Sequence, residues 1–355
     1  MTRSLLLSCR GGFESDCAAE IQQSASQLQV AGFSRTKPNQ GYVVFECFND
    51  SDADYLHQNI DFRSLVFTRQ WQVVTCLLEL DETDRISAIV EALADLPHFS
   101  AVAQDWPDTN DGKQMSGFCK KFARPLENAM HKRLHRKAPA LLQLFWLDGR
   151  HVFVGYRLIA NSSPYPMGIL RLRQSSEAPS RSTLKLDEAF AVLLNDDERE
   201  RYVQSGQHAV DLGACPGGWT YQLVRRSMYV AAIDNGPMAE NLMQSGQVKH
   251  YREDGFKYVP ARNNISWLVC DMVEKPSRVT RLMLKWLTQG WCRYAIFNLK
   301  LPMKKRYAEI AQDLEFLRQG LEQTGQQYEL RAKHLYHDRE EVTVFACLHQ
   351  SWKWS

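Results

Sequence analysis

The sequence lacks the features of several protein classes. Its nine cysteines are odd in number and never spaced as C-x-x-C, so neither a disulfide framework nor a zinc site is indicated. No stretch approaches 18 uninterrupted apolar residues, and the apolar run at 5–7 is too short for the core of a signal peptide. We therefore expect reduced, mostly buried thiols in a cytoplasmic protein with no membrane span and no metal.

The chain also lacks an excess of one charge. Lys and Arg number 43 against 41 Asp and Glu, and this net charge of +2 is too small to hold nucleic acid by bulk charge. Any nucleic-acid site must come from local clustering. Hydrophobic residues make up 44% of the 355 residues, which excludes a largely disordered chain, and this length predicts about two domains.

Short apolar runs alternate with helical patterns in the first half of the chain. They predict an α+β unit over 1–60, with strands at 4–8 and 41–47 and helices at 13–28 and 52–59. A second α+β unit over 61–165 has predicted strands at 71–80 and 99–105, helices at 84–96 and within 117–134, and a hairpin of 141–147 and 151–156. Asp148 and Gly149 form the turn dipeptide of that hairpin.

Residues 161–182 have a different composition. They carry three prolines and six serines without sustained periodicity, which is typical of an interdomain linker. We place the linker at 166–182, with the boundary near 175. Beyond it, near-continuous apolar runs at 209–212, 229–233, 267–270 and 295–299 are typical of strands buried on both faces, so residues 183–355 are predicted to form a doubly wound α/β domain.

A glycine-rich loop follows the first of these buried strands and reads Asp211-Leu-Gly-Ala-Cys-Pro-Gly-Gly-Trp219. Gly213, Gly217 and Gly218 allow tight turns and close approach to a ligand. The spacing differs from G-x-G-x-x-G, and Pro216 removes an amide that a pyrophosphate would use. A nucleoside cofactor without phosphates therefore fits better than a dinucleotide, although a plain strand-to-helix turn is as good an interpretation of the loop alone.

Acidic residues stand at the ends of the following strands. Asp234 ends the next strand 23 residues after Asp211, where the Rossmann arrangement places an acid on ribose hydroxyls. Asp254 follows a short apolar step, and Asp271 directly follows the run 267–270. One such acid is as often a solvated cap as a functional group, but three at successive strand ends favour a cofactor site.

With these motifs the second half resembles the S-adenosylmethionine-dependent RNA ribose 2′-O-methyltransferases, the family typified by the bacterial heat-shock rRNA methyltransferase. The cofactor loop of that family is similar to residues 211–219. Its Lys-Asp-Lys-Glu tetrad is matched here by Lys185, Asp271, Lys300 and Glu341, with Glu340 as a rival for the last position. From the first strand to about residue 348 the chain is similar to the 23S rRNA cytidine 2′-O-methyltransferases of gammaproteobacteria, through segments such as Asn298-Leu-Lys-Leu-Pro-Met-Lys-Lys-Arg306.

The resemblance implies a Rossmann-like methyltransferase domain behind a ferredoxin-like subdomain and a THUMP-type RNA-binding domain. It implies S-adenosyl-L-methionine as the cofactor, free or precursor 23S rRNA as the substrate, and a monomer that needs no metal. Lys300 would be the proton acceptor. Cofactor contacts are implied at Ser182, Gly213, Cys215, Pro216, Gly217, Gly218, Asp234, Asp254 and Asp271.

Ribose methylation makes chemical demands that these residues can meet. A hydroxyl must lose its proton as it attacks, and a lysine, with an ordinary pKa of about 10.4, accepts that proton only if its neutral form is favoured. Lys185 could supply a neighbouring cation or stabilise the alkoxide, whereas Asp271 would oppose the shift. An inactive methyltransferase domain in an RNA-binding or ribosome-assembly protein is the alternative from another class.

An RNA base methyltransferase is the second alternative. Transfer to an exocyclic amine usually accompanies an Asp or Asn followed by two prolines and an aromatic residue, whereas this chain has Asp271-Met-Val-Glu274. Transfer to a pyrimidine carbon needs a cysteine nucleophile. Cys270 should alternate away from Asp271 into the core, and Cys215 lies in the cofactor loop, so we interpret both as structural.

Local positive charge is concentrated before the linker. Residues 113–137 contain eight Lys or Arg and one acid, a net charge of +7 in 25 residues. Phe118, Phe122, His131 and His135 are interleaved, and Arg150, Arg157, Arg171 and Arg173 follow, which favours phosphate contacts and base stacking. A solvated helix face is the alternative. The basic residues are Lys113, Lys120, Lys121, Arg124, Lys132, Arg133, Arg136 and Lys137.

Overall fold

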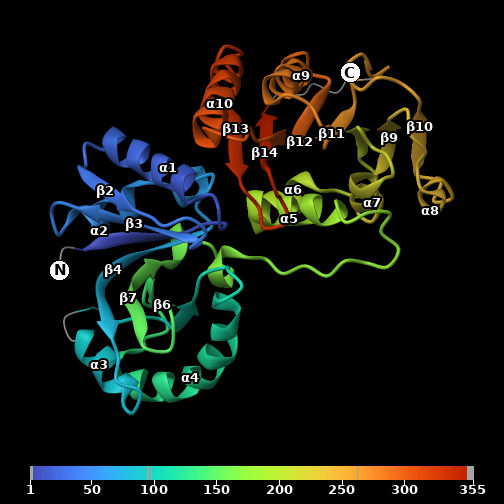
Figure 1. Cartoon of the computed structure of the whole chain (residues 1–355). Coiled ribbons are helices and arrows are strands. Elements are labelled where there is room, and N and C mark those ends of the chain that lie inside the picture. Colours follow the sequence, from blue (N-terminus) through green and yellow to red (C-terminus); the bar gives the residue numbers. More distant parts are fainter. Residues whose placement is uncertain (1–2, 94–95, 97, 262, 350–355) are drawn as a thin grey trace. The chain divides into compact units, whose positions relative to one another are not determined.

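Two seven-stranded sheets organise the chain in the computed structural model, which describes residues 3–93, 96, 98–261 and 263–349 (Figure 1). One sheet belongs to residues 1–169 and the other to residues 170–355. In the part of the chain that the structure describes, no helix is long and apolar enough to cross a membrane.

The first sheet has the order β2-β3-β1-β4-β7-β6-β5. Since β1 pairs with both β3 and β4, the regions predicted as two units, 1–60 and 61–165, contribute to a single sheet. The strands are β1 (Ser4–Ser8), β2 (Gly32–Arg35), β3 (Tyr42–Cys47), β4 (Gln70–Glu79), β5 (Val102–Asp105), β6 (Ala140–Trp146) and β7 (His151–Leu158). The helices are α1 (Glu14–Gln27), α2 (Asp52–Asn59), α3 (Arg85–Ala92) and α4 (Met115–Met130).

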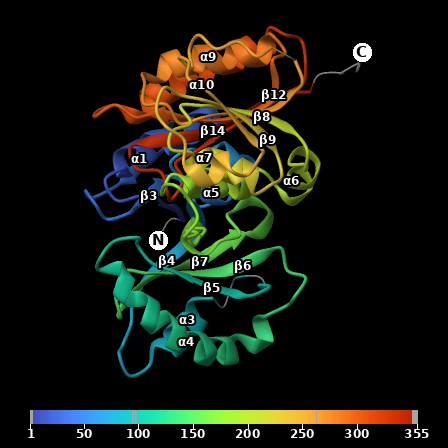
Figure 2. The ribbon, with the colours of Figure 1, turned by 90° about the vertical axis from the view of Figure 1, so that its right-hand side faces the viewer.

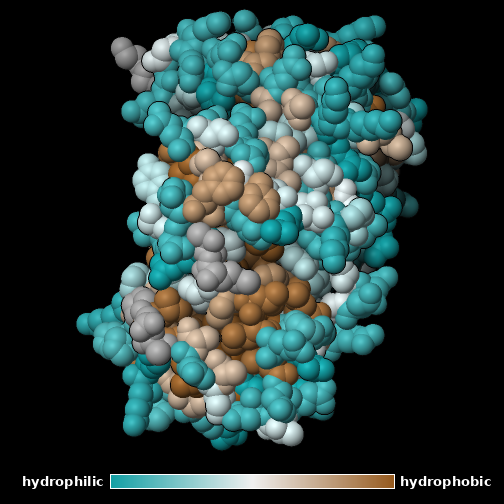
Figure 3. All heavy atoms as spheres, turned by 60° about the vertical axis from the view of Figure 1, so that its left-hand side comes forward, coloured by the Kyte–Doolittle hydropathy of each residue, from teal (hydrophilic) through white to brown (hydrophobic). Residues whose placement is uncertain are grey.

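Apolar residues line both faces of this sheet. Leu5 and Leu7 of β1 are fully buried on one face, while Leu6 points to the other and forms a cluster with Val74 and Phe145. The rings of Tyr42 on β3 and Phe145 on β6 lie 5.2 Å apart although three strands separate them, so the sheet is strongly curved. Some large apolar side chains of this unit stay exposed, including Phe33, Phe48 and Leu77, and Figure 3 shows a face of the protein on which hydrophobic side chains gather.

The predicted elements of the first half are largely confirmed, including the hairpin that becomes β6 and β7. Strand β2 was not predicted, because its four residues include a glycine and alternate between partly buried and exposed positions. The helix predicted at 84–96 ends at Ala92, and residues 94–95 of that prediction lie outside the described part.

The second sheet has the order β10-β9-β8-β11-β12-β14-β13. The first five strands in this order, β10, β9, β8, β11 and β12, run parallel to one another. Strand β14 is antiparallel to both of its neighbours, β12 and β13. The strands are β8 (His208–Leu212), β9 (Tyr229–Ile233), β10 (Val248–Tyr251), β11 (Ile265–Cys270), β12 (Cys292–Lys300), β13 (Tyr328–Lys333) and β14 (Glu341–Leu348).

Helices cover both faces of the second sheet, as a doubly wound domain requires. Figure 2 shows α9 and α10 on one side and α5, α6 and α7 on the other. The α/β class with a Rossmann-like second half is therefore confirmed, while the antiparallel end of the sheet was not foreseen. The helices are α5 (Thr183–Leu193), α6 (Asp196–Tyr202), α7 (Gly218–Val224), α8 (Glu240–Met243), α9 (Pro276–Thr288) and α10 (Arg306–Glu322).

A buried histidine makes the first unit sensitive to acid. His57 on α2 is fully buried and stacks on Trp71, with ring centroids 4.5 Å apart. Neither of its ring nitrogens has a hydrogen-bond partner among the described residues. Burial lowers the pKa of His57 from 6.5 to about 4, so the folded unit keeps the imidazole neutral where the unfolded chain takes up a proton.

We predict that His57 costs this unit stability as the pH falls from 6.5 towards 4, because this side chain binds a proton only in the unfolded chain; the buried Asp105, whose pKa is raised to about 6, contributes in the opposite direction. The loss should reach roughly 2 kcal/mol by about pH 5. His57→Phe should remove most of it, as measured by urea unfolding at two pH values. His131→Phe, at an exposed position, is the control and should keep the wild-type difference. An unchanged difference in His57→Phe would contradict the assignment.

Candidate active site

The candidate site lies at the carboxyl edge of the second sheet. From β8 the chain builds the sheet outward through β9 and β10, and it then returns to add β11 and β12 on the other side of β8. The loops after β8 and β11 therefore diverge and leave a crevice between them, which is where open α/β sheets bind ligands.

The glycine-rich loop after β8 needs its glycines for backbone reasons. Gly213 has φ +79° and Gly217 has φ +118°, conformations that other residues rarely adopt. A Cβ at Gly217 would lie 2.2 Å from a methyl of Leu242, and one at Gly213 would lie 2.5 Å from the Met272 side chain. The loop thus packs closely against the segments that follow β9 and β11. A cis peptide joins Cys215 to Pro216.

Beneath this loop lies a carboxylic acid that the sequence analysis did not assign. Asp211 is almost fully buried and accepts a hydrogen bond from the Thr220 hydroxyl at 2.6 Å. Burial raises its pKa to about 7, and the nearby carboxylates of Asp271 and Asp234 act in the same direction. Asp211 therefore connects the loop to the first turn of α7.

A cavity of about 450 Å³ opens beside the loop. Five predicted cofactor residues line it, namely Gly213, Cys215, Asp234, Asp254 and Asp271. Asn235, Glu253 and Phe256 also line it and were missed, although each is adjacent to, or two residues from, a predicted acid. The volume and the ring of acids fit a nucleoside whose hydroxyls and amines donate hydrogen bonds.

Asp234 is fixed by the loop it faces. Its carboxylate accepts hydrogen bonds from the backbone amides of Cys215 at 3.0 Å and Gly236 at 2.8 Å. A carboxylate has about four acceptor positions, so it keeps capacity for ribose hydroxyls. This geometry fits the Rossmann role that the sequence suggests for the residue.

The remaining predicted cofactor residues do not line the cavity. The Ser182 hydroxyl lies 2.7 Å from the Ser180 hydroxyl. A Cβ added at Gly218 would lie 2.2 Å from the hydroxyl oxygen of Ser182. Ser182 and Gly218 therefore pack against each other behind the loop. Pro216 and Gly217 shape the loop, and neither is part of the cavity lining.

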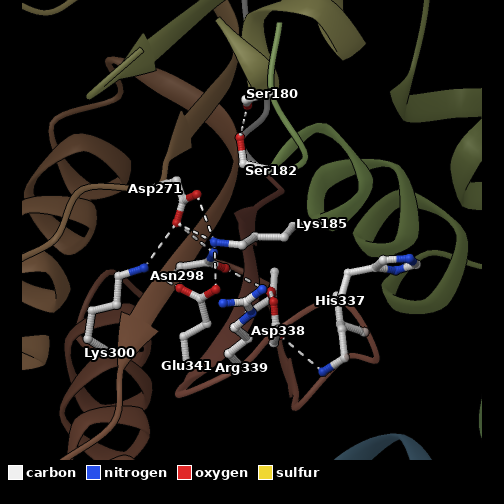
Figure 4. Close-up of polar contacts among 12 residues, drawn as sticks. Ser180, Ser182, Lys185, Asp271, Asn298, Lys300, His337, Asp338, Arg339 and Glu341 are labelled. Atoms are coloured by element: carbon white, nitrogen blue, oxygen red, sulfur yellow. Dashed lines mark hydrogen bonds and ion pairs between the residues drawn. The ribbon is translucent and has the colours of Figure 1, made fainter. Parts of the chain in front are cut away.

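Four charged side chains meet next to the cavity (Figure 4). The Lys185 ammonium, from the first turn of α5, lies 3.0 Å from Asp271 Oδ2 and 2.5 Å from Glu341 Oε1. The Lys300 ammonium, from the end of β12, lies 3.3 Å from Asp271 Oδ1 and also bonds to Glu341. The structure therefore brings all four residues of the predicted tetrad together.

The rival acid lies outside this group. Glu340 pairs with Arg306 at 3.2 Å, and 62% of its side chain is exposed. Glu341 opposes Lys300 in the β12–β14 register and has a side chain that is only 5% exposed.

Two lysines and two carboxylates give the cluster no formal net charge. Burial alone lowers the pKa of Lys185. The attraction of the carboxylates of Asp271 and Glu341 is stronger, so the pKa of this lysine is raised. Lys185 thus stays an ammonium over the whole physiological range. Of the two lysines, Lys300 is the more exposed, with 25% of its side chain accessible against 16% for Lys185.

Two polar neighbours of the tetrad were missed. Asn298 Nδ2 donates to Asp271 Oδ1 at 2.8 Å, and the Thr343 hydroxyl bonds to Asn298 Oδ1 at 2.8 Å. Both residues are fully buried. A signal existed, because side chains alternate along a strand, so Asn298 shares the face of Lys300 and Thr343 shares that of Glu341.

The cysteines behave as the sequence suggests. All nine are free. Cys270 is fully buried, and this burial raises the pKa of its thiol to about 12. Cys215 is partly exposed, but burial and Asp234 raise its pKa as well. Neither residue has the thiolate character of a nucleophile.

One group of side chains in the described part of the chain has the spacing of metal ligands. Donor atoms of Glu329, Cys347 and His349 lie within 4.8 Å of one another. Glu329 is already engaged by Arg331 and by the Tyr202 hydroxyl, and burial raises the pKa of Cys347 to about 12. These groups therefore fit an ion-pair network better than a metal site.

The structure corrects part of the interpretation of the basic cluster, here defined as Lys113 to Lys137. Phe118 and Phe122 stack on each other and contact Trp146 edge to face, so these half-buried rings are engaged in packing against the core. Arg157 is almost fully buried and donates to the Ser163 carbonyl at 2.6 Å. Phosphate contacts can come only from the exposed members, which include Lys120, Lys121 and Lys132.

Comparison with known proteins places these features in a family. Residues 178–302 match the family model "FtsJ-like methyltransferase". Residues 1–72 match "RlmM ferredoxin-like domain", and residues 84–158 match "Ribosomal RNA large subunit methyltransferase M, N-terminal". Glu341 lies beyond the matched part of the FtsJ-like region, so its place in the site rests on the geometry above.

Curated relatives match over nearly their whole length. The ribosomal RNA large subunit methyltransferase M of Pseudoalteromonas translucida is 52% identical over 346 residues, with 96% of each chain covered. The protein of that name from Photorhabdus sp. is 53% identical over 348 residues, covering 96% of this chain and 95% of its own. Among solved structures, TrmN from Thermus thermophilus aligns over 98% of this chain and 99% of its own at 12% identity, but its TM-score of 0.35 is too low to support an argument.

Proposed function

The chain belongs to the ribosomal RNA large subunit methyltransferase M family, and from this premise we propose that it methylates the 2′-hydroxyl of a cytidine in 23S rRNA. It is an rRNA methyltransferase with S-adenosyl-L-methionine as its cofactor. The observation that carries the assignment to ribose is the meeting of Lys185, Asp271, Lys300 and Glu341 beside the cavity.

The cavity provides the cofactor site of this proposal. S-adenosylmethionine, when bound, supplies an electrophilic methyl group on a sulfonium centre. Asp234 would accept hydrogen bonds from its ribose hydroxyls, and the segment around Asp254 and Phe256 would hold it from another side of the cavity. Asp271 belongs to both the cavity lining and the tetrad, so it links cofactor binding to the reacting hydroxyl.

Within the tetrad we assign the base to Lys300. Lys300 would accept the proton of the 2′-hydroxyl as its oxygen attacks the methyl group that the bound cofactor would supply. Lys185, whose ammonium both carboxylates hold, remains the permanent cation and stabilises the developing alkoxide. Asp271 and Glu341 orient the two lysines.

Two alternatives explain the cluster less well. An RNA base methyltransferase would need a polar group for the base edge or a cysteine nucleophile, but Asp271 is engaged by both lysines and Cys270 is a buried thiol. An inactive binding module would gain little from four mutually contacting charges, because such partly buried pairs add little net stability.

The further details of the proposal concern the substrate and the assembly. We assign RNA capture to a THUMP-type function of the first unit, through the exposed part of the basic cluster. A monomer acting on free or precursor rRNA in the cytoplasm is consistent with a cavity and tetrad built from residues of one chain. The free state of the RNA rests on the family resemblance.

Replacement of the base gives the first test of this function. Lys300→Ala should lower the rate of methyl transfer by 10²- to 10⁴-fold, roughly 3 to 5 kcal/mol, with cofactor affinity largely retained. Lys300→Arg should also be nearly inactive, because guanidinium does not release its proton usefully. Lys285→Ala on α9, an exposed lysine outside the site, is the control. Incorporation of tritiated methyl groups into rRNA at the wild-type rate by Lys300→Ala would overturn the assignment.

The cofactor assignment predicts a separate binding defect. Asp234→Ala should weaken S-adenosylmethionine binding by about 1 to 3 kcal/mol, because ribose hydroxyls lose a charged acceptor. Titration calorimetry should show this loss, and the wild-type protein should give no signal with NAD. Asp197→Ala, at an exposed position on α6, should bind the cofactor normally. Binding of NAD in place of S-adenosylmethionine would refute the assignment.

The basic cluster predicts a salt-dependent RNA affinity. Lys120→Glu combined with Lys121→Glu on α4 should weaken rRNA binding and reduce the slope of log affinity against log salt by up to about 1.4, since each lost phosphate contact on a single strand accounts for about 0.7. Arg133 is left unchanged because it donates to the Leu96 carbonyl.

The matched control for this pair is Lys249→Glu combined with Lys285→Glu, which reverses two exposed lysines on the second unit. Filter binding over a salt series should separate the two double variants, while both keep wild-type affinity for the cofactor. If the α4 variant binds rRNA as the wild type does, the cluster is a solvated face and RNA capture falls to the surface around Lys304 and Lys305.

A further inference from the structure

A chain of buried polar groups begins at Asp271 and continues through Asn298 (Figure 4). Asn298, on the central strand β12, donates from Nδ2 to Asp271 Oδ1 at 2.8 Å, which is shorter than either lysine contact to the same oxygen, both 3.3 Å. Thr343 faces Asn298 in the β12–β14 register. Its hydroxyl lies 2.8 Å from Asn298 Oδ1.

The chain ends at a carboxyl group. Thr343 Oγ1 lies 2.9 and 3.1 Å from the two oxygens of Asp338, and the backbone amide of Leu335 donates to Asp338 Oδ2 at 3.0 Å. Asn298, Thr343 and Asp338 are all fully buried. Water therefore does not compete for these bonds.

Proton counting fixes the direction of the bonds. A hydroxyl has one proton, and Thr343 stands between two acceptors, Asn298 Oδ1 and Asp338. If Thr343 donated to an ionised Asp338, two oxygens without a proton would face each other at 2.8 Å. If Asp338 instead carries a proton and donates it to Thr343, then Thr343 donates to Asn298 Oδ1, and the amide of Asn298 is held with Nδ2 towards Asp271.

We propose that Asn298 is a positioning residue for the Asp271 carboxylate, held in orientation by Thr343 and by a protonated Asp338. This inference rests on the proposed function, since Asp271 is taken to orient the two lysines of the methyl-transfer site. The amide bond opposes rotation of the Asp271 carboxylate, so Oδ2 stays directed at Lys185 and Oδ1 stays within reach of both lysines.

The surroundings of Asp338 favour its neutral form. Burial raises its pKa well above the ordinary value, and the carboxylates of Glu341 and Glu188 act in the same direction, against the contacts with the Thr343 hydroxyl and the Leu335 amide. Glu188 on α5 accepts from the backbone amides of Tyr336 and His337. Glu188 therefore holds the loop that carries Asp338, and its negative charge disfavours ionisation of Asp338.

Substitution of Thr343 tests the orientation of the amide. Thr343→Val has nearly the same shape but no hydroxyl, so Asn298 loses its fixed orientation and turnover should fall about 10- to 100-fold, the range typical of a misplaced catalytic group. Cofactor affinity and the KM for rRNA should stay close to wild type. Thr343→Ser restores the hydroxyl and should recover most of the turnover. Equal turnover in the two variants would overturn the proposal.

Substitution of Asp338 tests the proton. Asp338→Asn keeps a donor towards Thr343 and an acceptor for Leu335, so it should lose little turnover, whereas Asp338→Leu should resemble Thr343→Val. The side-chain carboxyl carbon of Asp338, assigned in the wild-type protein through its connectivity to the backbone resonances, should show the NMR shift of a neutral acid at pH 7. An ionised carboxylate there would refute the proposal even if a variant failed to fold.

Failure of this inference and failure of the proposed function give different results. If the site does not methylate ribose, wild-type protein transfers no methyl group to the 2′ position and Lys300→Ala changes nothing. If only the inference fails, the wild type is active, Lys300→Ala is inactive, and Thr343→Val keeps the turnover of Thr343→Ser.

Discussion

The site depends on the attraction between the Lys185 ammonium and the carboxylates of Asp271 and Glu341. Burial lowers the pKa of an ammonium that has only 16% of its side chain exposed, and partners of opposite charge counter this effect. Here two carboxylates lie at 3.0 and 2.5 Å and hold the charge in place. The same carboxylates also hold Lys300, so the four side chains form one electrostatic unit.

Sheet topology delivers these charges to one point. Asp271 follows a parallel strand, and Lys300 ends the neighbouring one, so both lie at the carboxyl edge. Because β14 runs antiparallel to β12, its first residue, Glu341, lies at that same edge, directly opposite Lys300. A fully parallel sheet would place the start of β14 at the other edge, and the fourth charge would be lost from the site.

The sequence was informative where one local signal determined the structure. The apolar runs of the second half became buried strands, and Asp234 and Asp271 follow those strands as their positions suggested. The sequence was uninformative where the structure depends on contacts between residues far apart in the chain. The curvature that brings Tyr42 near Phe145, the packing of Phe118 and Phe122 on Trp146 and the register of β14 depend on residues far apart in the chain.

The middle of the second sheet shows why function is the better explanation of its polar residues. Asn298 and Thr343 have apolar neighbours on their own strands, including Phe297, Leu299 and Val344, all fully buried. A hydrogen-bonded polar pair in such a place adds little net stability compared with a well-packed apolar pair. An apolar pair would still form the sheet, but it would leave Asp271 free to turn between its two lysines. The Asn298–Thr343 pair therefore stabilises the core less than an apolar pair would, but it fixes the Asp271 carboxylate at the edge of the sheet.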